Sequence, residues 1–509
     1  MPRKATLLLA AACLLAAIAL RVPAAPRYLY YEDSINFAQA VERYDPRHLV
    51  PQPPGYPIFV LQAKLLRAIA GSVENAFLLG VILATAIALF SLVMLARTAT
   101  GEWTPAIAAA ALLAINPVFL YTGFTSPIRI YLAAVSLSVA WTCWLAWNGD
   151  RRAAYIGAIV LGLGSGYRPE LLALLFPLWA VSSWRALRST RAWTTAAAVL
   201  TFSAALWIGF LLSYFPDLHA FVETFRKYLT DQSRDLSAVF GAEGAGSWVM
   251  ILRTAIWNGI AIAAWAVLAP LARPSFRPGL WTFAALWIVP ALVFQALVHL
   301  ADPDQALATI PAFCLIGGIV LVSFFRRNRD VALLAAAFVV IFNLAILYAP
   351  FPLKPERAWY TPLVESLWYT SHARHVGVQE RTDALLPALA RDLPLGRSLV
   401  LWNRSLVTWR TLSYYFPNQT FCLLLDDTST GNRRHAALWR GLELQERIFD
   451  QAGAPSPVIP LADSEYLLWV LGPTSPVRSA AAYRLDPRAD GLYRSRALPL
   501  DIPGYRIVR

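Results

Sequence analysis

Long apolar runs alternate with short polar loops over the first two thirds of the chain. A membrane-spanning helix needs about 20 mostly apolar residues, and about 11 runs are candidates. They lie near residues 5–22, 75–96, 103–123, 128–147, 153–167, 170–184, 192–213, 248–270, 280–300, 305–325 and 330–349. The fifth and sixth runs are short and flank GLGSGYRPE, which predicts a break in this helix pair. We interpret the first run as an uncleaved signal anchor, because its cleavage pattern is poor.

The pattern changes from about residue 350 onward. Short β-rich runs (SLVLWN, TFCLLL and YLLWVL) alternate with two amphipathic stretches that read as helices, RTDALLPALARDL and RHAALWRGLELQERIFDQAG. Such alternation is typical of an α/β domain. The predicted fold class is therefore mainly α: a polytopic transmembrane helical domain at 1–349, followed by a small external α/β domain at 350–509.

Basic residues mark one side of the predicted membrane domain. Cytoplasmic loops are enriched in Lys and Arg, and with the N-terminus inside, every predicted inner loop is basic. These loops carry Arg3, Lys4, Arg97, Arg151, Arg152, Arg185, Arg188, Arg191, Arg273, Arg277, Arg326, Arg327 and Arg329. The odd number of spans then places the C-terminal domain outside, with the loops at 23–74, 214–247 and 301–304. Abundant Arg, Ala and Leu indicate a bacterial chain, so we expect an inner-membrane protein with a periplasmic C-terminal domain.

The composition supports this picture. Of the 509 residues, 58% are hydrophobic and 15% are charged, and the mean hydropathy is +0.50. The net charge of +13 comes from short clusters between apolar runs, so we expect the lipid bilayer, and no nucleic acid, as a partner. The four cysteines have no disulfide or metal spacing, and the chain contains no Gly-rich nucleotide loop.

The first external loop carries the acidic pair Glu32 and Asp33, followed by SINFAQAVERY. Ile35, Ala38 and Val41 share one helical face, which predicts a short helix at the membrane surface that begins at Asp33. Asp33 could simply cap this helix. The helix dipole also favours an ionised carboxylate there, and such a group could accept a proton from an attacking hydroxyl. Glu32 is the secondary candidate.

Two further candidates lie in PQPPGYP and GYRPELL. The prolines and glycine of PQPPGYP predict rigid turns, which could present Tyr56 to a ligand. Arg168 lies between two apolar runs, where a charge is costly unless it is paired or faces water. Arg168 could pair with Glu170 or extend to the outer interface. Alternatively, it could hold a phosphate through aligned guanidinium donors.

Other polar residues lie at predicted outer helix ends. In VHLADPDQALATIP, His299 precedes Asp302 and Asp304, and His299 could serve as a cap or bind substrate. Arg129 and Arg253 are further substrate-binding candidates at the ends of other spans. A lone HxxD pattern is a weak zinc signal, so no metal site is assigned. A divalent ion near Glu32 and Asp33 is conceivable but not indicated.

These motifs resemble the GT-C glycosyltransferase superfamily, which includes protein O-mannosyltransferases and aminoarabinose transferases. More narrowly, EDSINFA, YD and PQPPGYP are similar to the first external loop of bacterial family-39-like homologues, in which DS-NFA is followed by HPPGYP. Here Gln52 stands where that pattern has histidine. GYRPELL also looks like a segment of these homologues.

The resemblance implies an inverting transfer of a sugar from a polyprenyl-phosphate donor to an extracytoplasmic acceptor, without a cofactor. By the match to DS-NFA, it gives Asp33 the role of general base. Two other classes stay open. A flippase for a lipid-linked saccharide should have paired, similarly interrupted helices in two halves. A non-catalytic assembly subunit should have lost the acidic pair.

Overall fold

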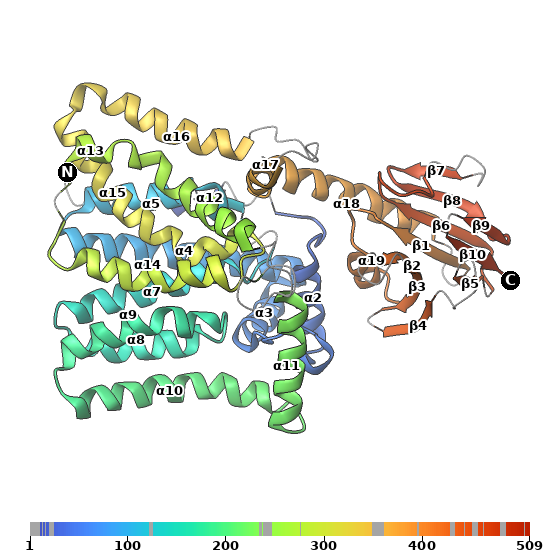
Figure 1. The fold of residues 1–509 in the computed structure, drawn as a ribbon, viewed down its shortest axis with the longest axis horizontal. Coiled ribbons are helices and arrows are strands. Elements are labelled where there is room, and N and C mark those ends of the chain that lie inside the picture. Colours follow the sequence, from blue (N-terminus) through green and yellow to red (C-terminus); the bar gives the residue numbers. More distant parts are fainter. Residues whose placement is uncertain are drawn as a thin grey trace. The chain divides into compact units, whose positions relative to one another are not determined.

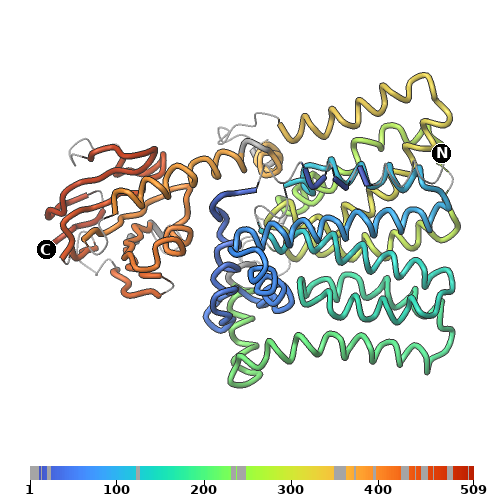
Figure 2. The backbone as a smooth tube through the Cα atoms, turned by 180° about the vertical axis from the view of Figure 1, so that it is seen from behind, coloured from blue at the N-terminus to red at the C-terminus, as the bar shows by residue number. Residues whose placement is uncertain are grey.

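The computed structural model describes residues 11–12, 14–15, 17–19, 25–121, 126–233, 237, 247–274, 276–348, 361–393, 397–427, 433–441, 443–449, 457–461, 463–478, 485–502 and 504–509. The chain forms two compact units (Figures 1 and 2). The first contains 1–25 and 36–375, and the second contains 26–35 and 376–509. The sequence places a domain boundary at 349/350, and that boundary remains a prediction.

Helices dominate the first unit. After α2 (Glu32–Glu42), they are α3 (Pro57–Ala70), α4 (Val73–Thr100), α5 (Trp103–Ala114), α6 (Pro117–Tyr121), α7 (Ile130–Trp147), α8 (Arg151–Gly164), α9 (Glu170–Leu187), α10 (Thr190–Leu212), α11 (Leu218–Ser233), α12 (Ser247–Ala266), α13 (Ala269–Ala272), α14 (Leu280–Leu297), α15 (Ile310–Arg327), α16 (Ala332–Tyr348) and α17 (Thr361–Trp368). Short 3₁₀ turns form at η2 (Pro46–His48), η4 (Pro303–Ala308) and η5 (Arg329–Val331).

Eight helices among the described residues are long and apolar enough to cross a membrane, fewer than the eleven spans that the sequence predicts. The predicted run at 103–123 is broken, because Pro117 has no N–H to continue α5 and Asn116 Oδ1 accepts from the backbone N–H groups of Val118 and Phe119. The run at 153–167 forms only the 14-residue α8. The run at 5–22 lies largely outside the described residues, as does its interpretation as a signal anchor.

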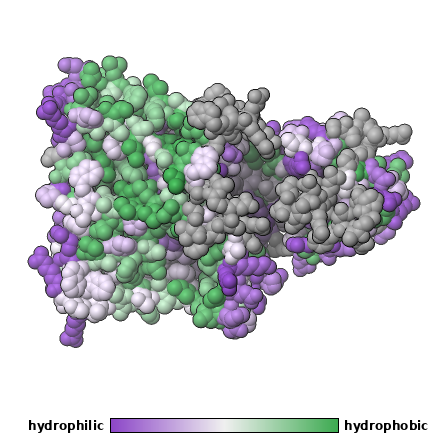
Figure 3. All heavy atoms as spheres, in the orientation of Figure 1, coloured by the Kyte–Doolittle hydropathy of each residue, from purple (hydrophilic) through white to green (hydrophobic). Residues whose placement is uncertain are grey.

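The membrane unit exposes much of its apolar surface, as a protein in a lipid bilayer should. Figure 3 shows apolar residues spread over the bundle. Large exposed hydrophobic side chains include Phe90, Ile156, Phe202, Phe210, Trp281, Leu333 and Ile341. α7 and α15 are central, with 83% and 78% of their apolar windows buried, whereas only 22% is buried in α16. The chain is therefore a multi-pass membrane protein.

The predicted inner loops gather at one end of this bundle (Figures 1 and 2). Arg326 forms an ion pair with Glu102, and Arg277 Nη1 donates to the Thr98 carbonyl at 3.2 Å. α2, α3 and α11 lie at the other end of the bundle, where α11 runs across the spans (Figure 1). The basic loops thus share one side, as the charge pattern predicts.

The helix predicted after Asp33 forms as α2, but its environment differs from the prediction. All residues from Ser34 to Val41 are buried, including the polar Asn36 and Gln39. Phe37 makes edge contacts with Tyr56 and with Phe59 of α3 at ring-centroid distances of 5.2 and 4.9 Å. The predicted face of Ile35, Ala38 and Val41 is therefore buried within the protein, and the location of the helix at the membrane surface remains a prediction.

The second unit is an α/β fold. After α18 (His372–Asp392) come β1 (Ser398–Asn403), α19 (Trp409–Tyr415), β2 (Thr420–Asp427), β3 (Arg433–Arg440), β4 (Glu443–Phe449), β5 (Val458–Pro460), β6 (Tyr466–Leu471), β7 (Asp486–Ala489), β8 (Leu492–Arg496), β9 (Leu500–Ile502) and β10 (Tyr505–Val508). One sheet has the order β4-β3-β2-β1-β6-β8-β7, and a smaller sheet has the order β5-β10-β9. β1 pairs in parallel with β2 and β6, which are the three predicted strands.

One predicted helix is wrong. RHAALWRGLELQERIFDQAG contains the antiparallel pair β3 and β4, with Arg440 opposite Glu443. Gly441 adopts φ +56°, a left-handed conformation that reverses the chain at low cost. β3 also pairs with β2 along its full length, and these pairings outweigh the helical periodicity of the sequence.

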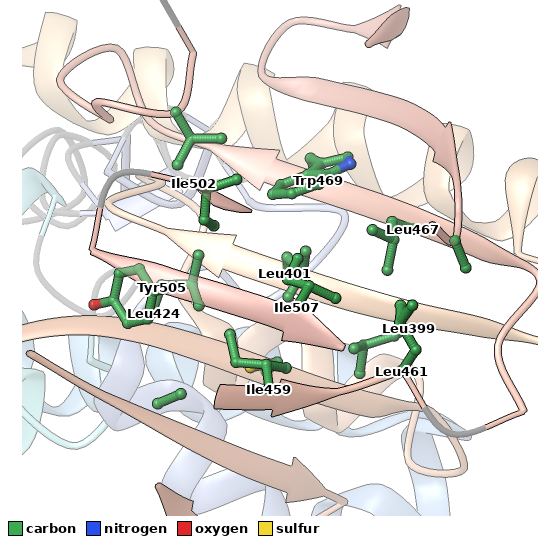
Figure 4. Close-up of a cluster of buried hydrophobic side chains, with 14 of the residues drawn as sticks. Leu399, Leu401, Leu424, Ile459, Leu461, Leu467, Trp469, Ile502, Tyr505 and Ile507 are labelled. Carbon is green, nitrogen blue, oxygen red and sulfur yellow. The ribbon is translucent and has the colours of Figure 1, made fainter. Parts of the chain in front are cut away.

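Apolar side chains cover both faces of the large sheet. On one face, Leu399 and Leu401 of β1 pack with Trp469 and with Ile459 and Ile507 of the smaller sheet (Figure 4). On the other face, Val400 packs with Leu385 and Leu389 of α18 and with Leu412 of α19. The unit therefore has a core of its own on each side of β1.

Candidate functional site

The PQPPGYP turn fixes Tyr56 at the start of α3. Tyr56 adopts φ 45° and ψ 52°, a left-handed conformation that is uncommon for residues other than glycine. Strained conformations of this kind persist where the surroundings enforce them, often at ligand sites. Here Gly55 at φ +84° and Pro57 flank Tyr56, and Phe37 packs on its ring. The ring is buried, as expected for a rigid wall.

Arg168 lies in the break between α8 and α9, as the sequence predicts. It is buried, and its Nε donates to Glu170 Oε1 at 2.7 Å, while Nη2 reaches the same oxygen. Its guanidinium carbon lies 5.5 Å from the centroid of the Tyr56 ring, in cation–π range. Burial acts to lower the pKa of Arg168, but Glu170 and Tyr56 outweigh it and the pKa is raised. Arg168 therefore stays charged, with donors left over.

Arg129 occupies the start of α7 and is also buried. Its Nη1 donates to Asp304 Oδ1 at 2.8 Å, and Nη2 lies 3.7 Å from Asp302 Oδ2. Asp302 and Asp304 are held by the η4 turn, in which Asp302 and Gln305 form a capping box. Arg129 therefore pairs with two aspartates, as Arg168 pairs with Glu170. The two arginines are close enough to interact electrostatically.

His299 connects these pairs. Burial, Arg129 and Arg168 lower its pKa to about 4, while Glu170 and Asp302 oppose the shift. All four charged groups thus act on one imidazole, which is neutral at physiological pH. Among the described residues, the two guanidinium groups of Arg129 and Arg168 pair with three carboxylates, those of Glu170, Asp302 and Asp304. We refer to Tyr56, Arg129, Arg168, Glu170, His299, Asp302 and Asp304 as the Arg–Asp cluster.

A buried amide network supports the η4 turn. Asn258 of α12 donates to Gln295 Oε1 of α14 at 2.9 Å, and Gln295 Nε2 donates to the Gln305 carbonyl at 3.2 Å. The Thr309 hydroxyl donates to Asn258 Oδ1. Two membrane helices therefore hold the turn that carries Asp302 and Asp304. In the sequence, isolated polar residues in apolar runs are the local signal of this network.

Arg253 belongs to a different group. Its guanidinium lies over Trp257 and Tyr369, 5.8 and 5.6 Å from the ring centroids, and its buried Nε has no hydrogen-bond partner among the described residues. Arg374 lies over the same Tyr369 ring at 3.8 Å and over Trp368 at 5.2 Å. In the described part of the chain, neither arginine forms an ion pair with a carboxylate. This arginine–aromatic cluster therefore brings two positive charges to the Tyr369 ring.

The sequence reasoning missed Arg374 and Tyr369. Both follow the last span, within the 350–509 region assigned to the external domain. They come close to Arg253 because α17 packs on α12, with Trp257 Nε1 donating to the Ser366 carbonyl at 3.0 Å. The arginine followed by histidine in SHARH was the only local signal.

Glu32 and Asp33 occupy the first turn of α2, within the second unit. Asp33 lies inside the helix, one residue after its start. Glu32 Oε1 lies 2.8 Å from Arg410 Nε of α19. Among the described residues, no group of three or more His, Cys, Asp or Glu side chains is arranged to hold a metal ion.

Comparisons with known proteins identify related chains. Residues 52–208 match the protein family described as Dolichyl-phosphate-mannose-protein mannosyltransferase. None of the curated proteins compared with the chain matches it in sequence.

Two solved states of ArnT share the fold of this chain, and a third solved structure matches it less well. ArnT from Cupriavidus metallidurans bound to undecaprenyl phosphate is 14% identical with a TM-score of 0.54, covering 82% of this chain and 85% of ArnT. The apo state of ArnT is 16% identical with a TM-score of 0.50, and the match covers 80% of this chain and 83% of ArnT. The Archaeoglobus fulgidus oligosaccharyltransferase is 16% identical with a TM-score of 0.40, and the match covers 81% of this chain and 61% of the oligosaccharyltransferase. The first two matches and the family match confirm the GT-C resemblance that the motifs predicted.

Proposed function

We propose that this protein is a membrane glycosyltransferase that moves a sugar, mannose-like or another hexose or pentose, from a polyprenyl-phosphate donor. The acceptor is a lipid, glycan or protein on the extracytoplasmic side of a bacterial inner membrane. The observation that carries the proposal is the gathering of four sequence-predicted residues, Tyr56, Arg129, Arg168 and His299, in a chain with an ArnT-like fold. Their burial and pairing are typical of a preorganised polar site.

Asp33 acts as the general base. The acceptor hydroxyl oxygen attacks the anomeric carbon on the face opposite the phosphate, and its proton passes to the Asp33 carboxylate. The bond between the anomeric carbon and the phosphate oxygen breaks, and its electron pair leaves with the polyprenyl phosphate. A single displacement inverts the anomeric configuration. This role for Asp33 rests on its residue type and on its place in the first turn of α2, where the helix dipole favours an anion.

The Arg–Asp cluster suits the sugar. Its two arginines are already paired with carboxylates, which compete with a phosphate, and the same carboxylates can stabilise the positive charge that develops at the anomeric carbon. The Arg168 Nε–H and one Nη2 hydrogen are directed at Glu170 Oε1. The remaining guanidinium donors can reach sugar hydroxyls or the leaving oxygen. Neutral His299 can hydrogen-bond to the acceptor. Tyr56 offers a fixed ring face.

The arginine–aromatic cluster suits the phosphate. Arg253 and Arg374 bring two positive charges to one aromatic ring, without a carboxylate partner among the described residues. Guanidinium groups bind phosphate oxygens through paired donors. We therefore move the phosphate from Arg168, where the sequence analysis placed it, to Arg253.

The base is tested by comparing purified wild type with Asp33→Asn on a panel of polyprenyl-phosphate sugars and cell-envelope acceptors. Asn keeps the size of Asp and its ability to accept a hydrogen bond, so the variant removes the carboxylate charge with little change in local structure. Asp217→Asn is the matched control, because Asp217 Oδ1 accepts from the Ala220 N–H as an external cap of α11. We expect transfer to fall about 100-fold or more for Asp33→Asn only. Undiminished transfer would exclude Asp33 as the base, and no transfer by wild type with any donor would favour the flippase or the assembly subunit.

The phosphate assignment has its own test. Binding of polyprenyl phosphate without a sugar should weaken at least about tenfold in Arg253→Gln, since a charged hydrogen bond contributes about 1.5–3 kcal/mol, and should change little in Arg168→Gln. The reverse result would return the phosphate to Arg168.

A further inference from the structure

The segment just before Asp33 is built into the C-terminal unit. The Leu29 N–H donates to the Tyr415 hydroxyl at 2.8 Å, and the Tyr28 and Tyr415 rings meet edge-on with centroids 5.2 Å apart. Tyr28 also packs against the apolar cluster formed by α18, α19 and the large sheet. Leu29 and Tyr30 are buried. Contacts between residues nearly 400 positions apart in the chain thus fix this segment.

Charged groups form a second set of contacts between this segment and the C-terminal unit. Glu32 Oε1 lies 2.8 Å from Arg410 Nε, and both side chains are partly exposed. Arg27 lies over the Tyr28 ring at 5.3 Å and interacts electrostatically with Asp383 of α18. A partly exposed ion pair contributes little to stability. Its geometry, however, restricts where the first turn of α2 can lie.

The surface that receives the segment is rigid. Thr408 caps α19 by accepting from the Thr411 N–H at 3.2 Å, and Thr411, Leu412 and Ser413 are buried. α19 lies between β1 and β2 in sequence and packs on the sheet they form. Arg410 and Tyr415, at opposite ends of this seven-residue helix, therefore have fixed positions.

α2 transmits this fixation to Asp33. Glu32 is the first residue of α2 and Asp33 is the second, and the Ile35 N–H donates to the Tyr31 carbonyl at 3.1 Å. Neighbouring residues of a helix have a set rise and rotation. A change in the position of Glu32 therefore changes the position of Asp33.

We propose that the C-terminal unit positions the catalytic carboxylate, with Tyr415 and Arg410 as positioning residues that hold Leu29 and Glu32. Glu32 is then a positioning residue and not a second catalytic group. The inference rests on the proposed function of Asp33. It gives the external unit a role in catalysis. The ion pair between Glu32 and Arg410 contributes by positioning Asp33 and takes no part in the chemical step.

A charge exchange tests the proposal. Arg410→Glu and Glu32→Arg should each lower kcat about tenfold or more while KM for the donor changes little, because a small misplacement of a reacting group is costly. The double variant should recover most of the wild-type kcat. Arg506→Glu is the matched control, since Arg506 pairs with Asp501 at 3.2 Å in the same unit and should leave kcat unchanged. Tyr415→Phe should also lower kcat.

Amide hydrogen exchange of the peptide 26–42 provides a readout that does not need activity. Exchange at Leu29 should become faster in Tyr415→Phe, and the faster exchange of the single charge variants should be reversed in the double variant. Wild-type kcat in Arg410→Glu, or a folded double variant that remains inactive, would overturn the proposal. If wild type transfers no sugar but exchange follows the expected pattern, the proposed function fails and the docking stands.

Discussion

Pairing decides what a substitution at Arg168 or Arg129 will do. Sequence analysis can recognise a charge beside apolar runs, because such a charge is costly in a membrane. It names Glu170 as a partner of Arg168 because the two are close in sequence. The partners of Arg129 lie 173 and 175 residues away, so only the fold reveals them. Burial, Arg129 and Arg168 lower the pKa of His299, and this environment was equally beyond local reasoning.

Removal of Glu170 should destabilise the protein more than removal of an exposed partner. Glu170→Gln leaves Arg168 buried without a counter-charge, and breaking a buried pair costs about 3–5 kcal/mol. Glu102→Gln removes the partner of Arg326, where both side chains are about half exposed and the expected cost is about 1 kcal/mol or less. Thermal unfolding in detergent should give a clearly larger decrease in Tm for Glu170→Gln. Equal decreases would show that Arg168 finds water or another partner.

His299 should make the fold sensitive to mild acid. Its pKa is lowered to about 4 in the folded protein, whereas an unfolded histidine titrates near 6.5. The unfolded chain therefore binds a proton first, so the stabilisation is complete above about pH 6.5 and is lost as the pH falls toward 4.

The measurement is Tm against pH for wild type and His299→Gln, with exposed His219→Gln as a control. Between pH 7 and pH 5, wild type and the control should lose more Tm than His299→Gln, by roughly 2 °C or more. Parallel curves would contradict the assignment.

At the scale of elements, the η4 turn depends on helices that do not contain site residues. Gln295→Leu should remove one of the two acceptors of the Asn258 amide, which also donates to the Thr254 carbonyl, and should leave the Gln305 carbonyl without the Gln295 donor. In this buried environment each loss costs about 1–3 kcal/mol. The turn should loosen, and sugar transfer should fall about tenfold or more through displacement of Arg129.

Asn343→Leu is the control for this prediction. Asn343 is also buried in a membrane helix, but the partner of its side chain among the described residues is the Val339 carbonyl of its own helix. Sugar transfer assays on both variants should show a loss for Gln295→Leu alone. A similar loss in both would mean that any buried amide in the membrane region matters equally.

Elements that follow from local chemistry were predictable. The break at GLGSGYRPE and strands β1, β2 and β6 appear where the sequence places them. The failures have tertiary causes. The stretch at 433–449 has helical periodicity but pairs with β2 as a strand, and the run at 103–123 divides because the Asn116 side chain starts a new helix. The arginine–aromatic cluster joins residues more than 100 positions apart, which no local pattern reports.

At the scale of the whole molecule, the distribution of basic loops predicts which face meets the cytoplasm. Arg152 lies in the first turn of α8, at the end of the bundle with the basic loops, whereas His219 lies on α11 at the other end, and both are exposed. Arg152→Cys should react with a membrane-impermeant maleimide only from the cytoplasmic side, and His219→Cys only from the opposite side.

The background for this test is favourable, because Cys143, Cys314 and Cys422 are buried. Cys13 is replaced by serine in both variants. Labelling of intact and inverted vesicles gives the orientation directly. Reaction of both cysteines from one side would contradict the arrangement, and a reversed pattern would move the Arg–Asp cluster to the cytoplasmic side.

The incorporation of residues 26–35 into the C-terminal unit also has a consequence for biosynthesis. Tyr28 and Glu32 leave the ribosome more than 370 residues before Arg410 and Tyr415. At about 5–20 residues per second, the early segment waits roughly 20–80 seconds for its partners. The contacts of the first turn of α2 with the C-terminal unit therefore form only after the last part of the chain has been made. Under the proposed mechanism, a nascent or truncated polypeptide inserts into the membrane without a competent base.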